Sequence, residues 1–344
     1  MNQLLTVVVP AYTAEAYLPY NLNSLCLGEV QEELEVLVID DGSTDRTGEI
    51  ADHYARHFPA IVRVIHKENG GHGSGINEGI ARAAGRYFKV VDADDWVDKE
   101  AFLSLIEALR SAEEDAVVSG FYWVFDDGSG CEAGFRKKAE IKEPFRGVIY
   151  HKTYSFDSIA DRIYLKMHGL TWKTELLRRI PKKIDEHCFY VDAEYILYPI
   201  PYVETVRFVP EFVYQYRIGR EGQSVSPEKM RLLESHYDRV LNSLLQFYEA
   251  CLNGKFRCSK EKQRYLASVI ARIAAGKMKI QLSAPASRKC GRELRTFDQL
   301  LKSHYPEIYH SNQNWAVRLL RASRFTLYPL AEAALRMKHS FKRR

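Results

Sequence analysis

Several features that would quickly assign this chain of 344 residues to a class are scarce or missing. Its six cysteines are widely scattered and form no C-x-x-C pair, so neither a disulfide framework nor a zinc site is indicated. No apolar run approaches the ~18 residues of a membrane-spanning helix. Internal repeats are missing, and the N-terminus lacks the basic and then apolar layout of a signal peptide. These absences predict a globular protein of the reducing cytoplasm.

Charge is distributed unevenly along the chain. Residues 1–120 contain 21 Asp and Glu but only 9 Lys and Arg, whereas the remaining residues contain 24 and 40. An acidic first part suits cation binding, and a basic second part indicates an anionic partner. The length exceeds the usual size of a single hydrophobic core, so two structural units are expected.

Short β-branched runs alternate with helical patterns over the first hundred residues. This alternation predicts an α/β protein with parallel βαβ units, in which ligands bind at the carboxyl ends of the strands. We expect the first strand to stop at Pro10, because proline cannot donate to a ladder of hydrogen bonds. We expect a helix from Ile76 to Ala84. The four predicted strands are Leu5–Val9, Glu35–Ile39, Ile61–Ile65 and Tyr87–Val91.

Three carboxylates follow the fourth predicted strand, in the sequence Asp92-Ala93-Asp94-Asp95. Carboxylates at this spacing repel one another and are costly to bury without a cation. Their hard oxygen atoms suit Mg²⁺ or Mn²⁺, which in turn binds a diphosphate. Alternatively, Asp94 or Asp95 caps a helix that begins near Val97. The four residues alone leave both interpretations open.

A glycine-rich loop follows the third predicted strand. Gly73, Gly75 and Gly79 do not have the spacing of a dinucleotide fingerprint, which would also follow the first strand. Flexible backbone before a helix suits a phosphate, and a tight turn with close helix packing explains the glycines equally well.

Four segments together resemble, in order and spacing, the family 2 glycosyltransferases with the GT-A fold. The resemblance extends from about Leu4 to Ser226, and it implies a Rossmann-like, mixed and mainly parallel sheet flanked by helices. It also implies an inverting, metal-dependent transferase of the bacterial, non-processive type. The four segments are Val7–Tyr12, Val38–Asp45, Asn69–Gly79 and Asp92–Asp95.

The resemblance also implies roles for individual residues. Asp92 would contact the ribose of a nucleotide-sugar, and Asp94 would bind the divalent metal, Mn²⁺ or Mg²⁺. His72 is expected to be a loop residue near this donor rather than a catalyst. The other implied donor contacts are Pro10, Ala11, Tyr12, Asp41, Asn69, Gly70, Ala93 and Arg217.

A candidate general base lies further along the chain. Family members usually have Glu-Asp at a helix start, and here Val191 replaces the Glu while Asp192 keeps the place of the base. A sugar hydroxyl needs such a base, because its pKa is far above neutral. Asp192 could instead cap the helix, and Glu194 and Asp185 are reserve candidates.

The segment Tyr214–Arg217, followed by Gly222–Ser226, resembles the family's loop over the donor diphosphate. Arg217 and Arg220 would meet phosphate there, although a solvated basic turn is an equal alternative. The Q-x-x-R-W signature of processive synthases is missing, which favours transfer of one sugar per encounter. A hairpin turn is predicted at Asp126–Gly130.

These observations predict three regions: residues 1–120 for the nucleotide-sugar and metal, 121–226 for the acceptor and catalysis, and a helical region, 227–344. The final segment, Trp315–Arg344, has eight Lys and Arg against one Glu, interleaved with apolar residues. Such a segment suits the surface of an anionic membrane, here the inner face of the cell membrane. Packing against the core or in a homodimer is the compatible alternative. No nucleic-acid-binding motif accompanies the charge.

The resemblance therefore predicts transfer of a sugar, from a UDP-sugar, to a hydroxyl of a bacterial surface glycan or a lipid-linked acceptor. A sugar-1-phosphate nucleotidylyltransferase is one alternative, but it would have a basic glycine-rich loop where this chain has Ala11–Glu15. A non-catalytic glycan-binding or scaffolding domain is the other. Such a domain would not need Asp92, Asp94 and Asp192 together.

Overall fold

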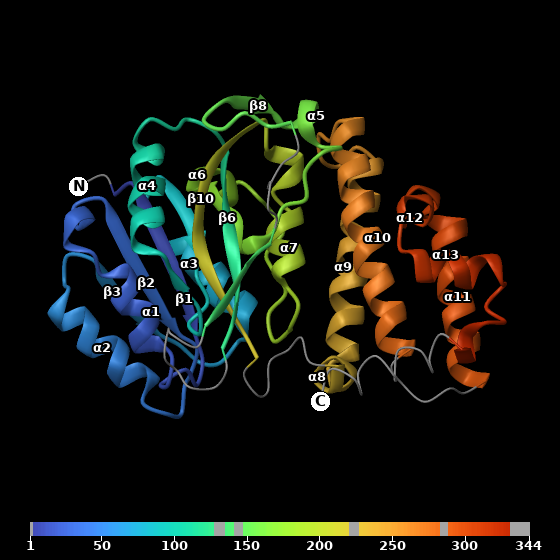
Figure 1. The fold of residues 1–344 in the computed structure, drawn as a ribbon, viewed down its shortest axis with the longest axis horizontal. Helices are drawn as coiled ribbons and strands as arrows, with labels where there is room; N and C mark the ends of the chain where they lie inside the picture. Colours follow the sequence, from blue (N-terminus) through green and yellow to red (C-terminus); the bar gives the residue numbers. More distant parts are fainter. Residues whose placement is uncertain (1–2, 127–134, 141–146, 220–226, 283–287, 331–344) are drawn as a thin grey trace. The chain divides into compact units, whose positions relative to one another are not determined.

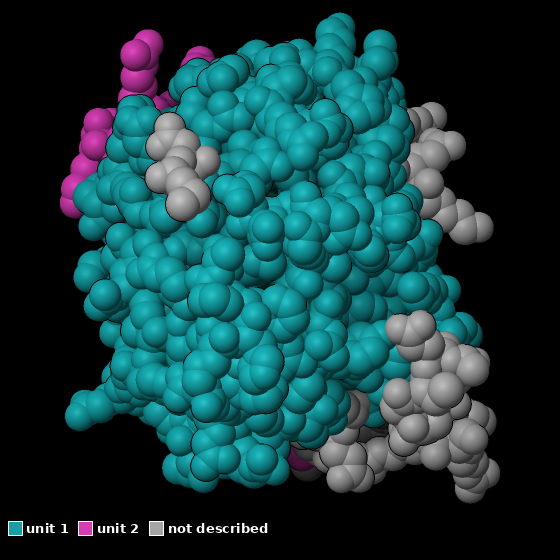
Figure 2. Space-filling model, turned by 90° about the vertical axis from the view of Figure 1, so that its left-hand side faces the viewer, with its two compact units in different colours: residues 1–221 teal, residues 222–344 magenta. Residues whose placement is uncertain are grey.

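The computed structural model describes residues 3–126, 135–140, 147–219, 227–282 and 288–330 (Figure 1). The chain divides into two compact units, residues 1–221 and 222–344, which are coloured separately in Figure 2. The predicted turn after Asp126, the segment Gly222–Ser226 with Arg220, and the end of the basic tail lie outside the described residues.

One mixed sheet runs through the first unit. Across the sheet the strands follow the order β3-β2-β1-β4-β9-β6-β10-β5, with β7 beside β6 and β8 beside β10. The pairs among β3, β2, β1 and β4 are parallel, as is the pair β6 and β10, whereas β9 is antiparallel to both neighbours. The strands are β1 (Leu5–Ala11), β2 (Leu34–Asp40), β3 (Val62–His66), β4 (Tyr87–Val90), β5 (Trp96–Val97), β6 (Ala116–Phe125), β7 (Arg136–Ala139), β8 (Thr153–Ser155), β9 (Leu170–Lys173) and β10 (Thr205–Ile218).

The expectation that the first strand stops at Pro10 is wrong. Strand β1 continues to Ala11, and Pro10 pairs with Ile39 of β2. Successive residues of a parallel strand face opposite neighbours. The carbonyl of Val8 accepts from Val91, next to β4, and that of Ala11 accepts from Asp41, next to β2. Pro10 therefore faces the side on which β4 has already ended, where a missing N–H leaves no partner unsatisfied.

Helices cover both faces of this sheet (Figure 1). Leu22, Ala51 and Phe102 belong to a core cluster that packs three helices, α1, α2 and α4, against one face. On the other face, Gly79 of α3 lies directly on Val8 of β1. The helices of this unit are α1 (Leu18–Leu25), α2 (Thr47–His57), α3 (His72–Arg82), α4 (Lys99–Arg110), α5 (Phe156–Ile159), α6 (Thr174–Arg178) and α7 (Asp192–Leu197), with short 3₁₀ turns η1 (Gly28–Val30), η3 (Met167–Gly169) and η4 (Ile200–Tyr202).

This topology places a ligand edge between β1 and β4. The chain moves from β1 to β3 in one direction across the sheet and returns to the other side of β1 as β4. Ligands in open α/β sheets bind where the direction reverses, beyond the carboxyl ends of the strands. Tyr12 directly follows β1, and the acidic loop Asp92–Asp95 follows β4.

Two helices begin at residues other than those expected. Helix α3 begins at His72, four residues before Ile76, because the glycine loop itself forms the first helical turn. Helix α4 begins at Lys99, and its cap is Asp98, whose side chain accepts a hydrogen bond from the N–H of Ala101 at 3.1 Å. Capping by Asp94 or Asp95 is therefore wrong, and the acidic loop needs another explanation.

The second unit is helical in its described residues, as expected. No described helix is both long and apolar enough to cross a membrane. Val317 and Leu320 of α13 are buried in a core cluster, and Arg321 donates to Asp298 at 2.8 Å. The first part of the basic tail is thus packed into this unit. The helices are α8 (Pro227–Leu232), α9 (Glu234–Leu252), α10 (Lys260–Leu282), α11 (Arg288–His304), α12 (Pro306–Ser311) and α13 (Trp315–Ala322).

Candidate active site

The acidic loop after β4 is held from two sides. On one side, the side-chain amide of Asn21 donates to the carbonyls of Asp92 and Asp95, at 3.0 and 2.9 Å. On the other side, Asp95 accepts from the Tyr214 hydroxyl at 2.6 Å and from the backbone N–H of Arg217 at 2.8 Å. Burial of Asp95, together with the nearby charges of Asp94 and Asp92, raises its pKa well above the usual range. Asp95 is therefore an internal support for the loop.

Asp92 lies at the centre of a group of polar side chains. Its Oδ1 is 2.8 Å from Nε2 of His72, and its backbone N–H donates to the Tyr214 hydroxyl at 3.1 Å. Burial opposes its ionisation, but the charge of His72 and the hydrogen bond between them lower the pKa of Asp92. The carboxylate is consequently charged at neutral pH and faces His72.

Asp92, Asp95 and His168 form a group that could hold a metal ion. One ligand atom from each lies within 4.8 Å of the others. The buried Nδ1 of His168 has no hydrogen-bond partner among the described residues. Burial lowers the pKa of His168 to about 4, so its imidazole is neutral, as a metal ligand must be. Carboxylate and imidazole are donors that a divalent ion can accept. Both oxygens of Asp95, however, already accept hydrogen bonds within the loop. The group does not include Asp94, whose role in metal binding stays a prediction.

Asp192 is the first residue of α7 and lies across His72 from Asp92. Its Oδ1 is 3.9 Å from Nδ1 of His72, and its side chain is 51% exposed. The cap residue of α7 is Val191, so Asp192 does not take the cap position that the sequence offered for it. Burial of its surroundings raises the pKa of Asp192, and the charge of His72 lowers it. An accessible carboxylate beside the ligand edge can accept a proton from a bound hydroxyl.

The reserve candidate Glu194 has a different environment. Its side chain is fully buried, and its two oxygens accept from the N–H of Asp185 at 2.7 Å and from the Tyr198 hydroxyl at 2.8 Å. Burial raises the pKa of Glu194 to about 7. These contacts hold the segment before α7, and Glu194 lies in the lining of a cavity.

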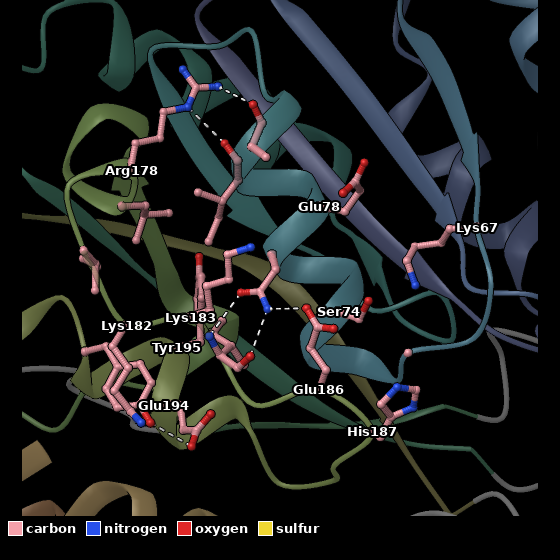
Figure 3. Close-up of a pocket in the computed structure, with 18 of the residues that line it drawn as sticks. Lys67, Ser74, Glu78, Arg178, Lys182, Lys183, Glu186, His187, Glu194 and Tyr195 are labelled. Carbon is pink, nitrogen blue, oxygen red and sulfur yellow. Dashed lines mark hydrogen bonds between the residues drawn. The ribbon is translucent and has the colours of Figure 1, made fainter. Parts of the chain in front are cut away.

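That cavity has a volume of about 750 Å³ and lies beside α3 (Figure 3). Its lining includes Asn69, Gly70 and Glu194 but neither Asp92 nor Asp192. Asn77 of α3 donates to the carbonyl of Ile184 at 2.9 Å and to Glu186 at 3.0 Å, and these bonds are drawn as dashed lines in Figure 3. The segment before α7 is therefore fastened directly to α3.

Asp41 and the residues from Lys67 to Gly71 form a second polar group, beyond β2 and β3. Asp41 is buried, and its carboxylate accepts from Lys67 at 2.7 Å, from the N–H of Gly70 at 2.9 Å and from the N–H of Gly71 at 2.7 Å. Asn69 donates to the carbonyl of Asp41 at 2.9 Å. Three of the predicted donor contacts, Asp41, Asn69 and Gly70, are thus brought together by hydrogen bonds to Asp41.

The residues at the end of β1 differ in exposure. Pro10 and Ala11 are buried, and so is Ala93 in the acidic loop. Tyr12 is 56% exposed, and an exposed aromatic ring can stack on a planar ligand. Of these predicted donor contacts, Tyr12 therefore offers the largest accessible surface.

Arg217 is buried inside the protein rather than presented to solvent. Its Nε donates to the carbonyl of Asp94 at 3.1 Å, and its guanidinium pairs with Asp126 at 2.5 Å. These contacts hold the acidic loop, and a direct contact with a donor stays a prediction. Four aromatic rings surround the guanidinium: Trp96 at 4.7 Å, Phe135 at 5.3 Å, Tyr17 at 5.4 Å and Tyr20 at 5.6 Å.

Comparison with known proteins assigns the chain to a family. The sequence profile of Glycosyl transferase family 2 matches residues 6–179, which include the Asp41 group and the acidic loop. The chain is also 30% identical over 255 residues to the glycosyltransferase EpsJ of Bacillus subtilis, covering 72% of this chain and 70% of EpsJ. The chain belongs to glycosyl transferase family 2.

This glycosyltransferase has further relatives. It is 28% identical over 264 residues to TarS of Staphylococcus aureus, a poly(ribitol-phosphate) β-N-acetylglucosaminyltransferase, covering 70% of this chain but only 43% of TarS. Residues 1–349 of TarS, solved in complex with UDP, match its structure with a TM-score of 0.62 at 20% identity, over 98% of this chain and 92% of the TarS chain. The fold is GT-A, as predicted, and the family is one of enzymes that transfer sugars.

Several residues that contact or approach the acidic loop were not expected. These residues are Asn21, His168 and Tyr214. Tyr214 lies in the segment that resembles the family's loop over the donor diphosphate, so the sequence did indicate that region. His168 and Asn21 belong to no motif, so neither could be singled out before the fold was known.

Proposed function

We propose that this enzyme is an inverting, metal-dependent glycosyltransferase that moves a sugar from a UDP-sugar to a hydroxyl of a bacterial surface glycan or lipid-linked acceptor. The relationship to TarS, which acts on poly(ribitol-phosphate) and was solved with UDP, supports this acceptor class and donor. One observation carries the proposal: Asp92 from the end of β4 and Asp192 from the start of α7 meet across a single histidine.

The proposed roles follow the two sides of that histidine. Asp92 contacts the donor ribose, Asp94 the metal, and Asp192 removes the proton of the acceptor hydroxyl as it attacks the anomeric carbon. A direct displacement of this kind inverts the anomeric configuration. The remaining donor contacts are Pro10, Ala11, Tyr12, Asn69, Gly70, Ala93 and the Asp41 group, with Arg217 behind them.

The departing UDP needs its new negative charge neutralised. A divalent ion supplies that neutralisation when it is bound, so no acid is required on the leaving side. The acidic loop positions its carboxylates for this purpose through Asn21 and Tyr214. His168, neutral and without a hydrogen bond at Nδ1 among the described residues, is a further candidate ligand.

We also propose a separate role for each region of the chain. Residues 1–120 bind the donor and metal, 121–226 bind the acceptor and carry out catalysis, and 227–344 bring the enzyme to the membrane surface. On α13, Trp315, Arg318 and Leu319 are exposed at helical spacing, opposite the buried Val317 and Leu320. A basic face with an indole suits contact with an anionic membrane surface, at the inner face of the cell membrane. A homodimer through the same face is the competing proposal.

The experiment that tests the proposed function compares two substitutions in α7. We expect Asp192→Asn to keep UDP binding and to lower sugar transfer by ~10²–10⁴-fold, because it removes a positioned base and preserves its shape. The readouts are UDP affinity by calorimetry with Mn²⁺ and turnover of UDP-sugars.

The matched control is Glu194→Gln. Its amide can keep the hydrogen bond from the N–H of Asp185, so we expect turnover close to that of the unmodified enzyme. Near-normal turnover in Asp192→Asn together with a large loss in Glu194→Gln would make Glu194 the base. Failure of the unmodified enzyme to bind any UDP-sugar would refute the donor assignment.

A further inference from the structure

A row of aromatic side chains leads from the core of the sheet toward its carboxyl edge. In the parallel pair of β6 and β10, Phe121 lies beside Tyr214, and Trp123 lies beside Tyr216. Residues two apart in a strand face the same side of a sheet. Phe121 and Tyr214 are buried, whereas Trp123 and Tyr216 are only partly buried. The row therefore ends in two rings that solvent reaches.

The open end of this row lies on the side of the acidic loop. Strands β6 and β10 run in the same direction as β4, because β9 is antiparallel to both β4 and β6. The ring centres of His168 and Tyr216 are 4.4 Å apart, and a nitrogen of His168 lies within 4.8 Å of a carboxylate oxygen of Asp92. Turn η3, which contains His168, also contacts α7.

Asp192 at the start of α7 is close enough to Tyr216 for its charge to act there. Burial raises the pKa of Tyr216, and the carboxylates of Asp95 and Asp192 raise it further. The exposed end of the aromatic row and the proposed base therefore border the same region.

Polar groups accompany the two exposed rings, whose centres are 4.9 Å apart. The indole N–H of Trp123 donates to Glu140, and Glu140 pairs with Lys166 at 3.6 Å. In the part of the chain that the structure describes, the Tyr216 hydroxyl has no hydrogen-bond partner. The group thus combines apolar ring surface with a carboxylate, an ammonium and an available hydroxyl.

A sugar ring fits this combination better than a polyol phosphate does. The C–H groups of a pyranose pack on aromatic rings, and the hydroxyls at its rim bind carboxylates and phenols. An acyclic polyol phosphate has no comparable flat face. Its negative charge would also be repelled by Glu140, while Lys166 is already paired.

We propose that Trp123 and Tyr216 form the acceptor subsite of this enzyme, and that the acceptor unit is a neutral pyranose. Trp123 packs against the C–H face of this sugar, and Glu140 and Tyr216 bind its hydroxyls. The inference rests on the proposed function, in which Asp192 removes the acceptor proton. It narrows the acceptor to a glycan that ends in a sugar ring.

Fluorine NMR of the full chain labelled with fluorotryptophan tests the subsite directly. The chain has four tryptophans, and Trp123→Phe identifies the signal of Trp123. The probes are the methyl β-glycosides of glucose, galactose and N-acetylglucosamine, each titrated with and without UDP and Mg²⁺. We expect at least one of them to shift the Trp123 signal saturably, with a millimolar Kd. The buried Trp172 and the 76% exposed Trp315 are internal controls whose signals should not move.

Ribitol phosphate is the comparison ligand, and it should leave the Trp123 signal unchanged. A saturable shift with ribitol phosphate and with no glycoside would overturn the inference, and so would equal shifts at Trp123 and Trp315. If the protein binds UDP but no glycoside shifts Trp123, the subsite is wrong and the proposed function stands. If a glycoside shifts Trp123 but UDP does not bind, the donor assignment is wrong and the subsite stands.

Kinetics with the glycoside that shifts Trp123 separate the acceptor from the transferred sugar. We expect Trp123→Phe and Tyr216→Phe each to raise the KM for that acceptor by ~3–10-fold and to leave the KM for the UDP-sugar unchanged. The matched control is Tyr122→Phe on the opposite face of β6, where Tyr122 packs against Phe212, and its acceptor KM should not change. A rise in the donor KM with an unchanged acceptor KM would place the two rings at the transferred sugar and overturn the inference.

Discussion

At the scale of single residues, Lys89 is a buried lysine that lies behind the acidic loop. It is fully buried in β4, three residues before Asp92, and its ammonium donates to the carbonyls of His168 at 2.8 Å and Leu170 at 3.3 Å. The structure gives it no carboxylate among the described residues. Burial lowers the pKa of Lys89 from 10.5 to about 7. Lys89 thereby ties the turn that contains His168 to β4.

This burial makes stability depend on pH in a defined direction. The unfolded chain keeps the Lys89 proton up to about pH 10, whereas the folded chain releases it near pH 7, so the contribution of Lys89 to stability rises with pH in between. We expect Lys89→Met to gain stability relative to the unmodified protein at pH 7, and this relative gain to shrink by about 2 kcal/mol at pH 9.

Thermal unfolding of both proteins at the two pH values measures this change. Groups such as His72, whose raised pKa acts in the opposite direction, are common to both proteins and cancel in the comparison. A difference between the two proteins that stays constant from pH 7 to pH 9 would contradict the assignment of a depressed pKa to Lys89.

Asp94 and His168 offer competing ligands for the metal. We expect Asp94→Ala to abolish Mn²⁺-dependent UDP binding and leave the fold intact, because Asp94 lies at a ligand edge and its carboxylate is not part of the core. His168→Gln tests the alternative group of Asp92, Asp95 and His168. Calorimetric titration of UDP with and without Mn²⁺ separates them. Unchanged affinity in Asp94→Ala with a loss in His168→Gln would assign the metal to the histidine-containing group.

At the scale of elements, the contact between α3 and the segment before α7 sets where α7 begins relative to the acidic loop. A Cβ on Gly73 would collide with the backbone of Asp185, and backbone cannot move aside as a side chain can. We expect Gly73→Ala to displace the start of α7, to cost about 1–3 kcal/mol of stability and to lower turnover by at least ~10-fold.

Gly28→Ala is the matched control for Gly73→Ala. No atom lies within 4 Å of a Cβ at Gly28, so we expect stability and turnover within error of the unmodified enzyme. Thermal unfolding and donor hydrolysis measure both effects. Full activity in Gly73→Ala would show that the position of Asp192 does not depend on this contact.

The elements that the sequence predicted well are those determined by local pattern. The four N-terminal strands are confirmed to within two residues, and the region from residue 227 on is helical in its described residues, because β-branched runs and helical spacing act over short distances. The short strand β5 and the antiparallel β9 were not expected, because their pairing depends on neighbours far along the chain. For the same reason Tyr214 and His168, which complete the acidic group, could not be found from spacing alone.

For the whole molecule, the proposed membrane contact depends on the exposed face of α13. Because Val317 and Leu320 are core residues, deleting the helix would expose the interior of the second unit. Surface substitution is the cleaner test. Trp315 and Leu319 are 76% and 47% exposed, and we expect Trp315→Ser with Leu319→Ser to weaken binding to anionic vesicles without changing turnover of UDP-sugars.

The control replaces two exposed leucines elsewhere in the same unit, Leu232→Ser and Leu252→Ser. Co-sedimentation with anionic and neutral vesicles, with light scattering alongside, measures binding and oligomeric state together. The homodimer would be favoured instead if the unmodified protein does not bind anionic vesicles and if the variant with both Trp315→Ser and Leu319→Ser is a monomer where the unmodified protein is a dimer.

The support of Asp95 by Tyr214 and Arg217 also has a consequence for the order of events during translation. The acidic loop leaves the ribosome about 120 residues before the strand that holds it. At about 5–20 residues per second, this interval lasts roughly 6–24 s. During that time the loop has only its early neighbours, such as Asn21, which donates to the backbone carbonyls of Asp92 and Asp95. A nascent chain stalled before Tyr214 should therefore contain most of the parallel strands but should not bind the nucleotide donor. Donor binding would begin only when β10 joins the sheet.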